Sequence, residues 1–342
     1  MYKATLSKDY MGCKAGDTIL LERANAGHVL VMQKPLEFAE ADPSQAHGEG
    51  GHLIVRPGGI GDLVHLGASI REVAKKSGRK VDVAVAERYT CVVKHNPNVR
   101  KVIHYPTTAD VFDQYEVIHW LEDSVEEEVE LHMADAFLEH CGFDHTQYEP
   151  TEKSPELYLP KSIKPKPKPK RRRVGFQLKA SAKCRTPDPA LMAKVMEIYF
   201  QEGWDVWIFG APGEVTTDEK AITNTTQWDK PPSILESASY MQTCDLFIAP
   251  DSGLLHIAGA LKIPSVGLYG PFPADLRVRY SPYCVAVEAK APCAPCFWHG
   301  RGSHFPPGCP GAKAGKCIVT AAIQPETIVR AGELAMQKKF DR

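Results

Sequence analysis

An aspartate placed directly after a glycine-rich turn is the first group in this sequence that could do chemistry. The segment Val55 to Val73 has the pattern of a buried strand, a turn that contains Gly59 and Gly61, and then a helix. Such a turn aims backbone N–H groups and the positive end of the helix at whatever binds above it. Asp62 follows the turn, where its carboxylate could act as a general base toward a substrate hydroxyl. The alternative is that Asp62 only caps the helix.

A second junction of a strand with a helix, at Asp251, Ser252 and Gly253, has the properties of an anion-binding site. An apolar strand ends here and a helix starts at once, so that amide groups and the helix dipole favour negative charge. Gly253 allows close approach of the backbone, and a diphosphate group would fit. His256 lies one turn into the helix, where it either points toward the ligand or is buried as a structural residue.

Cations follow another predicted strand. Residues 175–188 have the pattern of a strand and then a loop that contains Lys179, Lys183 and Arg185. A cation in this loop could neutralise a diphosphate as its bond to a transferred group breaks. The alternative is an ordinary surface loop with three cations.

A strand that ends at Gly210 precedes a carboxylate, Glu214, and a helix predicted near Glu219. Glu214 could hold a ribose or a base beside the same sheet edge. Carboxylates are also common at the N-termini of helices, which is the alternative.

Four of the ten cysteines lie close together near the C-terminus. Their spacing is C-x2-C, twelve residues, and then C-x7-C, formed by Cys293, Cys296, Cys309 and Cys317. This spacing is compatible with a closed tetrahedral zinc site, in which His299 or His304 could replace one thiolate. Disulfide pairing and free thiols remain the alternatives. The other six cysteines are scattered singly and are interpreted as reduced thiols.

These candidate residues need strands and helices that bring them together. From residue 52, compact apolar runs alternate with helical stretches, and the alternation returns after residue 173. This pattern is typical of parallel sheets with helices on both faces. We therefore expect an α/β fold with two Rossmann-like lobes, each a parallel sheet with flanking helices. Ligands would bind beyond the carboxyl ends of the strands, in a cleft between the lobes.

A small N-terminal appendage precedes the lobes. Residues 1–50 carry short β-prone runs, at residues 18–21 and 29–31, that are set off by glycines and followed by a linker. Residues 51–162 form the predicted N-terminal lobe and residues 163–342 the C-terminal lobe.

A basic, proline-rich strap from Lys161 to Arg173 marks the predicted boundary between the lobes. Its alternating prolines exclude a helix and favour an extended chain. The eight Lys and Arg residues of the strap indicate a solvated linker, and binding of nucleic acid or phospholipid is the alternative.

Composition limits the class of protein. Apolar residues make up 43% and charged residues 24% of the chain, which is typical of a soluble globular protein. The formal net charge of -1 leaves the choice of partner open. The chain contains neither an apolar run long enough for a membrane span nor a signal peptide at its start, so a cytoplasmic location is expected.

At these motifs the chain resembles glycosyltransferase family 9, the bacterial heptosyltransferases, over about residues 52–335. The run from Gly58 to Asp62 resembles the N-terminal GD motif of the family. The run from Ala249 to Pro271 resembles its C-terminal D-[ST]-G-x-x-H-x-A motif. The resemblance implies the GT-B architecture of two facing Rossmann-like lobes, with an N-terminal acceptor lobe and a C-terminal donor lobe.

The resemblance also implies roles for individual residues. Asp62 would be the catalytic base, and residues 251–253 with His256 would bind the donor diphosphate. Arg185 stands where the family has a lysine, with Lys183 as its competitor. Gly210 and Glu214 match a G-x-x-x-E segment of the family, and the segment from Cys293 to Phe297 occurs in similar form in some relatives.

Two departures from the family pattern concern the acceptor. The appendage is not part of the usual heptosyltransferase and resembles small domains of phage-encoded proteins. The proline that commonly follows the GD motif is replaced by the run Leu66-Gly67-Ala68, next to the expected acceptor site.

The sequence therefore predicts an inverting glycosyltransferase that moves a sugar from a nucleoside-diphosphate donor to an acceptor hydroxyl. Asp62 would deprotonate the acceptor, while Arg185 or Lys183 and the helix end at Ser252 would stabilise the leaving group. No D-x-D pair lies near these motifs, so catalysis is predicted to need no divalent metal, and a structural zinc is the one cofactor considered.

The acceptor and the catalytic role each have alternatives. The acceptor could be a glycan such as a lipopolysaccharide core. It could also be DNA with a modified base, bound by a phage-type enzyme whose strap contacts phosphates. A non-catalytic protein that binds nucleotide sugars is the alternative from a different class.

Overall fold

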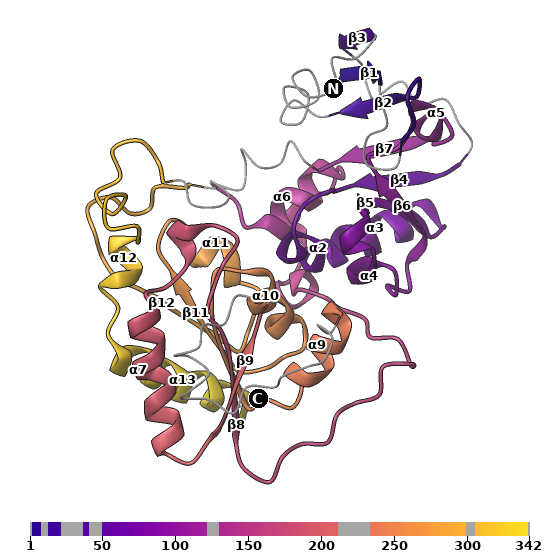
Figure 1. Ribbon diagram of the computed structural model, residues 1–342. Helices are drawn as coiled ribbons and strands as arrows, with labels where there is room; N and C mark the ends of the chain where they lie inside the picture. Colours follow the sequence, from indigo (N-terminus) through magenta and orange to yellow (C-terminus); the bar gives the residue numbers. More distant parts are fainter. Residues whose placement is uncertain are drawn as a thin grey trace. The chain divides into compact units, whose positions relative to one another are not determined.

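The chain divides into two compact units, each built on a parallel sheet (Figure 1). The computed structural model describes residues 2–7, 13–21, 37–40, 50–121, 130–210, 233–298 and 305–340. Residues 1–128 and 134–148 belong to the first unit, and residues 129–133 and 149–342 to the second. The predicted strand at residues 29–31 and the predicted helix near Glu219 lie outside the described residues.

The described strands of the first unit form a four-stranded parallel sheet in the order β6-β5-β4-β7. These strands are β4 (His52–Val55), β5 (Val81–Ala86), β6 (Val99–Tyr105) and β7 (Val117–Trp120). The α-helices of this unit are α2 (Ile60–His65), α3 (Gly67–Ser77), α4 (Thr90–Val93), α5 (Ala109–Phe112) and α6 (Met133–His140). Short 3-10 helices are η2 (Glu87–Tyr89) and η5 (His145–Gln147).

The strand order of the first unit contains one reversal. The chain adds β5 and β6 on one side of β4 and then returns to add β7 on the other side. The reversal therefore lies between β4 and β7, which pair in parallel with Val55 beside Trp120. In open parallel sheets, ligands bind beyond the carboxyl ends of the strands at such a switch point.

The appendage is a three-stranded antiparallel sheet in the order β2-β1-β3. Its strands are β1 (Tyr2–Thr5), β2 (Thr18–Leu21) and β3 (Glu37–Glu40). A small core of buried side chains holds it together, formed by Ala4, Leu6, Cys13 and Ile19. An isolated bridge joins Ile19 to Thr108 of the first unit. The predicted β-rich appendage is confirmed.

The described strands of the second unit form a five-stranded parallel sheet in the order β12-β11-β10-β8-β9. They are β8 (Arg173–Gln177), β9 (Asp205–Phe209), β10 (Leu246–Pro250), β11 (Ser265–Tyr269) and β12 (Cys284–Glu288). The α-helices are α7 (Pro189–Gln201), α9 (Ile234–Met241), α10 (Gly253–Ala260), α11 (Asp275–Val278), α12 (Ile318–Ala321) and α13 (Pro325–Phe340). Short 3-10 helices are η6 (Pro150–Lys153) and η7 (Lys183–Arg185).

Helices cover both faces of this sheet. The side chains of Val266 and Leu268 belong to the same core cluster as apolar residues of α7 and α13. Gly267 lies between them and points the other way, because side chains alternate along a strand. A Cβ at Gly267 would lie 2.8 Å from Leu255 of α10, so α10 packs on the opposite face. The α/β class with two parallel sheets and flanking helices is thus confirmed.

The basic strap (residues 161–173) runs as a long loop without helix or strand from η6 to the first residue of β8, at the edge of the second unit (Figure 1). Half of its cations are docked on that unit: Lys166 over Tyr240 (4.7 Å), Lys168 on Asp245 (3.6 Å), Arg172 over Trp204 (4.5 Å) and Arg173 on Asp205 (2.7 Å). The other four are exposed and make no ion pair with a described residue: Lys161, Lys164, Lys170 and Arg171. The strap is therefore more than a freely solvated linker.

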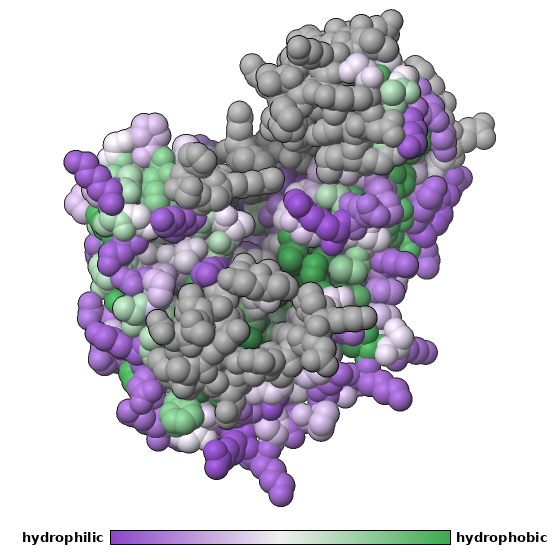
Figure 2. All heavy atoms as spheres, viewed as in Figure 1, coloured by the Kyte–Doolittle hydropathy of each residue, from purple (hydrophilic) through white to green (hydrophobic). Residues whose placement is uncertain are grey.

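Among the coloured residues in Figure 2, hydrophilic ones predominate, and apolar ones form small groups between them. This distribution matches the burial of the strand residues in the two sheets. Across the described parts of the chain, every helix is too short or too polar to span a bilayer.

Candidate active site

The switch point of the second unit lies between β8 and β10. The chain adds β9 beside β8, then returns to place β10, β11 and β12 on the other side. Residues that follow the carboxyl ends of β8 and β10 therefore meet at this position. Ser252, which follows β10, donates a hydrogen bond to the side-chain oxygen of Gln177, the last residue of β8. The predicted anion-binding junction is thus located at the switch point.

Gln177 is a residue that the sequence motifs did not indicate. Its amide oxygen fixes the hydroxyl of Ser252, which is itself the N-cap of α10 and has extended backbone angles. The cap residue forms no side-chain bond to the first turn of α10. The helix starts at Gly253, the position where a close backbone approach was predicted.

Arg185 reaches the same junction from the loop after β8. Its Nη1 lies 3.2 Å from the backbone oxygen of Asp251 and 3.4 Å from the Oδ2 of that residue. Its Nη2 donates to the hydroxyl of Ser181 at 2.8 Å. The remaining nitrogen, Nε, is buried and has no hydrogen-bond partner among the described residues. The guanidinium group is therefore held beside the start of α10 with hydrogen-bonding capacity left.

Asp251 is a buried charge surrounded by cations. Its side chain is 6% exposed, and its Oδ1 lies 3.6 Å from the Nε2 of His256. Burial alone would raise the pKa of Asp251, but the His256 contact and the charges of Arg185 and Arg277 hold it well below its usual value. The carboxylate therefore helps to hold the guanidinium of Arg185 and is poorly suited to be a general base.

His256 points into the second unit, where it is 3% exposed. Its contact with Asp251 answers the question that the sequence left open, because the imidazole is satisfied inside the unit.

A layer of buried polar side chains lies behind this junction and was missed by the sequence motifs. Arg277 is 3% exposed and stacks on Phe272 at 4.5 Å. His132 is fully buried and meets the ring of Tyr280 at 4.4 Å. Burial, together with the charges of Arg277 and His256, lowers the pKa of His132 well below its usual value. These residues are far apart in the sequence and follow no regular spacing, so no sequence motif could indicate that they lie together.

The other predicted donor-binding residues are less closely tied to the junction. Lys183 is exposed, and its Nζ would lie 2.9 Å from a Cβ at Gly315. Of the two competing cations, Arg185 is thus the one that contacts Asp251. Gly210 is exposed just after β9, and Glu214 lies outside the described residues.

Asp62 occupies the switch point of the first unit. Its Oδ2 accepts from the backbone N–H of Gly59 at 3.0 Å and pairs with the Nη2 of Arg56 at 3.0 Å. Arg56 follows β4 and also donates to the backbone oxygen of Leu121, which follows β7, at 2.7 Å. The Arg56 side chain is 5% exposed, whereas that of Asp62 is 25% exposed.

The two interpretations of Asp62 are therefore compatible. Its carboxylate does bond back to the start of α2, as a capping residue would. It also remains open to solvent, in an orientation fixed by a buried arginine. Gly58 favours this arrangement, because a Cβ there would lie 2.9 Å from the Oδ2 of Asp62 and the carboxylate would have to shift. Gly59 and Gly61 lie at the N-cap and in the first turn of α2.

The predicted cysteine cluster lies beside the end of β11. The backbone N–H groups of Cys296 and Phe297 donate to the oxygen of Pro271 at 3.1 and 2.9 Å. Burial raises the pKa of Cys296, and the thiols of Cys317, Cys293 and Cys309 are near enough to raise it further. In the described ranges, no three cysteines bring their sulfur atoms within 4.8 Å of one another. His299 and His304 lie outside the described residues.

A different trio, Glu139, Asp144 and His145, does bring its ligand atoms within 4.8 Å of one another. These three side chains already form hydrogen bonds within the segment of residues 139–146. The Nδ1 of His145 lies 2.6 Å from the Oε1 of Glu139, and Asp144 caps the turn at Thr146. We therefore interpret the trio as a loop anchor.

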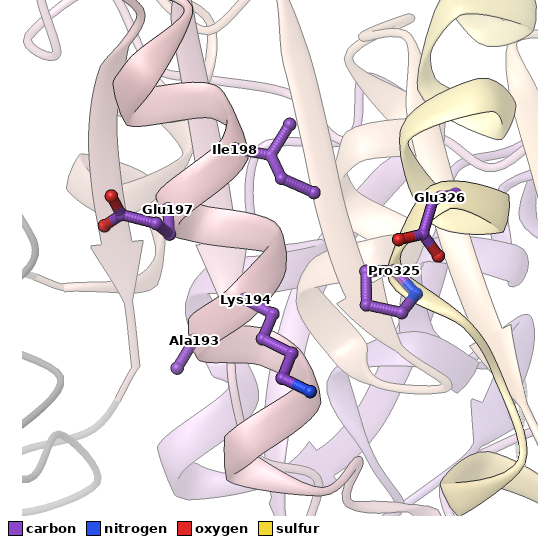
Figure 3. Close-up of a pocket in the computed structure, with 6 residues that line it drawn as sticks. All are labelled: Ala193, Lys194, Glu197, Ile198, Pro325 and Glu326. Atoms are coloured by element: carbon purple, nitrogen blue, oxygen red, sulfur yellow. The ribbon is translucent and has the colours of Figure 1, made fainter.

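A hollow of about 440 Å³ opens between α7 and α13 (Figure 3). It is lined by Ala193, Lys194, Glu197, Ile198, Pro325 and Glu326. No residue of the switch-point site lines it. The hollow is therefore separate from the chemistry considered above.

Several solved structures share the fold of this chain. Heptosyltransferase II of Escherichia coli, an ADP-heptose lipopolysaccharide heptosyltransferase, is 14% identical with a TM-score of 0.62, covering 84% of this chain and 99% of that one. A family 9 glycosyltransferase of Veillonella parvula is 14% identical with a TM-score of 0.61, covering 87% and 100%. The iron-containing dodecameric glycosyltransferase TibC of enterotoxigenic E. coli is 13% identical with a TM-score of 0.64, covering 90% and 83%.

These similarities show the GT-B class of fold. Residues 123–302, just over half of the chain, match glycosyltransferase family 9 (heptosyltransferase). The chain belongs to this family and is a glycosyltransferase. A comparison with curated protein sequences gave no significant match.

Proposed function

We propose that this protein is an inverting glycosyltransferase that uses a nucleoside-diphosphate sugar as donor. The observation that carries the proposal is the junction at the switch point of the second unit. There the amide end of α10, the hydroxyl of Ser252 and the guanidinium of Arg185 converge. A helix N-terminus combined with a fixed cation is suited to bind a diphosphate.

In the proposed reaction, Asp62 accepts the proton of the acceptor hydroxyl, and the resulting oxygen nucleophile attacks the anomeric carbon of the sugar. The bond from that carbon to the diphosphate breaks, and both electrons leave with the phosphate oxygen. Arg185 and the amides of α10 stabilise the developing charge, which is where electrostatic catalysis is most effective. No step requires a divalent metal.

The donor is proposed to be ADP-heptose or a closely similar sugar nucleotide, because E. coli heptosyltransferase II acts with ADP-heptose. The test is a panel of sugar nucleotides, each assayed for thermal stabilisation of the protein and then for transfer in the presence of EDTA. The expected result is that ADP-linked sugars raise the melting temperature most, since ligands that bind the native state stabilise it. Absence of stabilisation by every sugar nucleotide and by ADP would contradict the proposal.

The acceptor is proposed to be a glycan hydroxyl, as in a lipopolysaccharide core. The four exposed cations of the strap favour one alternative, DNA that carries a modified base, because phosphates attract uncommitted Lys and Arg residues. Incubation with labelled donor and either core oligosaccharide or modified duplex DNA separates the two. Stabilisation by donor without transfer to any acceptor would instead favour a non-catalytic binding protein.

We also propose that the four clustered thiols hold a structural metal ion. Thiolates suit zinc and iron, and TibC is an iron-containing relative in fold. Four thiols in this segment could together bind one ion: Cys293, Cys296, Cys309 and Cys317. Their sulfur atoms would have to move closer together to share it.

Elemental analysis of the purified protein tests this proposal. We expect about one equivalent of zinc or iron per chain, and its loss in Cys293→Ser and Cys296→Ser. Cys141→Ser, which alters a buried thiol of the first unit, is the matched control and should retain the metal. A metal-free protein with four alkylatable thiols in this segment would contradict it.

A further inference from the structure

The cysteine-rich segment contacts the loop that carries Arg185 in its middle and at its end. The arginine loop is defined here as residues 178–188, and the cysteine-rich segment as residues 293–298 and 305–317. Within the loop, the hydroxyl of Thr186 accepts a hydrogen bond from the amide of Ala180 at 3.1 Å, which joins the two ends of residues 180–186. The link from Arg185 to Asp251 is long, at 3.2 to 3.4 Å. A bond from Arg185 to Ser181 at 2.8 Å lies within the loop, and contacts from outside the loop add to these.

The first such contact is made by the residue next to Arg185. Cys184 is 2% exposed, and its Sγ lies 3.9 Å from the backbone oxygen of Trp298. The thiols of Cys296 and Cys317 are also close enough to influence the pKa of Cys184, which burial raises to about 11. The side chain of Cys184 is therefore buried against the cysteine-rich segment.

The second contact fixes the end of the loop. The Nζ of Lys316 lies 2.7 Å from the Oδ2 of Asp188. The other carboxylate oxygen of Asp188 caps α7 by accepting from the amide of Ala190 at 3.0 Å. The side chain of Lys183 adds a third contact, because its Nζ lies next to Gly315.

The cysteine-rich segment is itself anchored to the sheet. Cys296 and Phe297 bond to the oxygen of Pro271, just beyond β11. A Cβ at Gly270 would lie 3.2 Å from the Sγ of Cys317, so the side chain of Cys317 packs closely on the backbone of Gly270. The segment thus connects the carboxyl end of β11 to both the middle and the end of the arginine loop.

We propose that the cysteine-rich segment positions Arg185 for stabilisation of the leaving diphosphate, acting through Cys184 and through the Lys316–Asp188 ion pair. The role of Arg185 in this proposal rests on the proposed function. The mechanical link, by which the cysteine-rich segment holds the arginine loop, does not depend on that function. Lys316 is a positioning residue in this scheme and touches no substrate. A small displacement of a charged group from its working geometry is sufficient to slow a reaction measurably.

Hydrogen exchange of the protein without ligand tests the mechanical link. In Lys316→Met, backbone amides of residues 180–188 should exchange roughly two- to fivefold faster, the range expected for loss of a half-exposed ion pair. The cap of α7 is retained, because Asp188 keeps its bond to Ala190. Lys313→Met, which changes an exposed lysine of the same segment that has no ion pair among the described residues, is the matched control. Equal exchange in the two variants would overturn the proposal.

A double-mutant cycle tests the functional consequence. We expect Lys316→Met to lower kcat roughly two- to fivefold with little change in KM for the donor, and Lys316→Arg to restore it. In an Arg185→Ala background, Lys316→Met should have no further effect. An equal loss in both backgrounds would show general destabilisation and overturn the proposal. If the native protein transfers no sugar, the proposed function fails, and the exchange experiment still decides whether the segment holds the loop.

Discussion

Replacement of Asp62 by asparagine is expected to lower kcat by roughly 10²- to 10⁴-fold, the usual contribution of a positioned general base. Asparagine is the variant of choice because it keeps the size of the side chain and an oxygen that can accept from Gly59. It removes only the capacity to take a proton at this site. Binding of ADP, measured by calorimetry, should change little, since the residues of the proposed donor site all belong to the second unit.

The buried partner of Asp62 makes a second control necessary. Arg56 loses its ion pair with Asp62 in the variant, and removing one partner of a buried charge is destabilising. The melting temperature must therefore be measured beside kcat, and the activity compared well below the transition. Asp113→Asn, an exposed carboxylate of the same unit, should behave like the native protein. Unchanged turnover in folded Asp62→Asn would eliminate its assignment as the base.

Replacement of Arg185 by alanine is expected to lower kcat by roughly 10²- to 10³-fold, the cost of losing one group that stabilises charge in the transition state. The effect on KM for the donor should be smaller, because the amides of α10 and the hydroxyl of Ser252 remain. Arg185→Lys should recover only part of the loss. Lysine keeps the charge but lacks the planar fork that here spans Asp251 and Ser181.

Lys183→Met tests the other candidate for the cationic role, because the sequence left the choice between Arg185 and Lys183 open. Lys183 is exposed and lies next to Gly315, so its removal should reduce kcat by less than about threefold. Kinetics of both variants with the same donor, together with thermal unfolding, separate the two cations. A larger loss in Lys183→Met than in Arg185→Ala would reverse their roles.

Much of the fold follows from local patterns in the chain. Apolar runs such as residues 81–86 and 246–250 form buried strands, and the intervening periodic segments form helices. The strand predicted at residues 18–21 is present with those bounds. Two short glycine-containing junctions gave the positions of Asp62 and Ser252, because each follows directly from a strand that runs into a helix.

Contacts between distant residues could not be predicted in the same way. Gln177 is 75 residues from Ser252, and Leu121 is 65 residues from Arg56. Nothing in the sequence near Asp62 indicated that a buried arginine would hold it. The choice between Lys183 and Arg185 was also open, since both lie in one loop and only the fold directs Arg185 toward Asp251.

The amino-acid sequence by itself determined the element types, the α/β class and the motifs that point to sugar transfer. These properties depend on the period of apolar residues and on the conformational freedom of glycine, which act over a few residues. The tertiary structure decided which side chains meet at each switch point, how the strap is docked and how the cysteine-rich segment reaches Cys184 and Asp188. Such contacts depend on strand order and on packing across the sheet, which bring together residues that local spacing leaves unrelated.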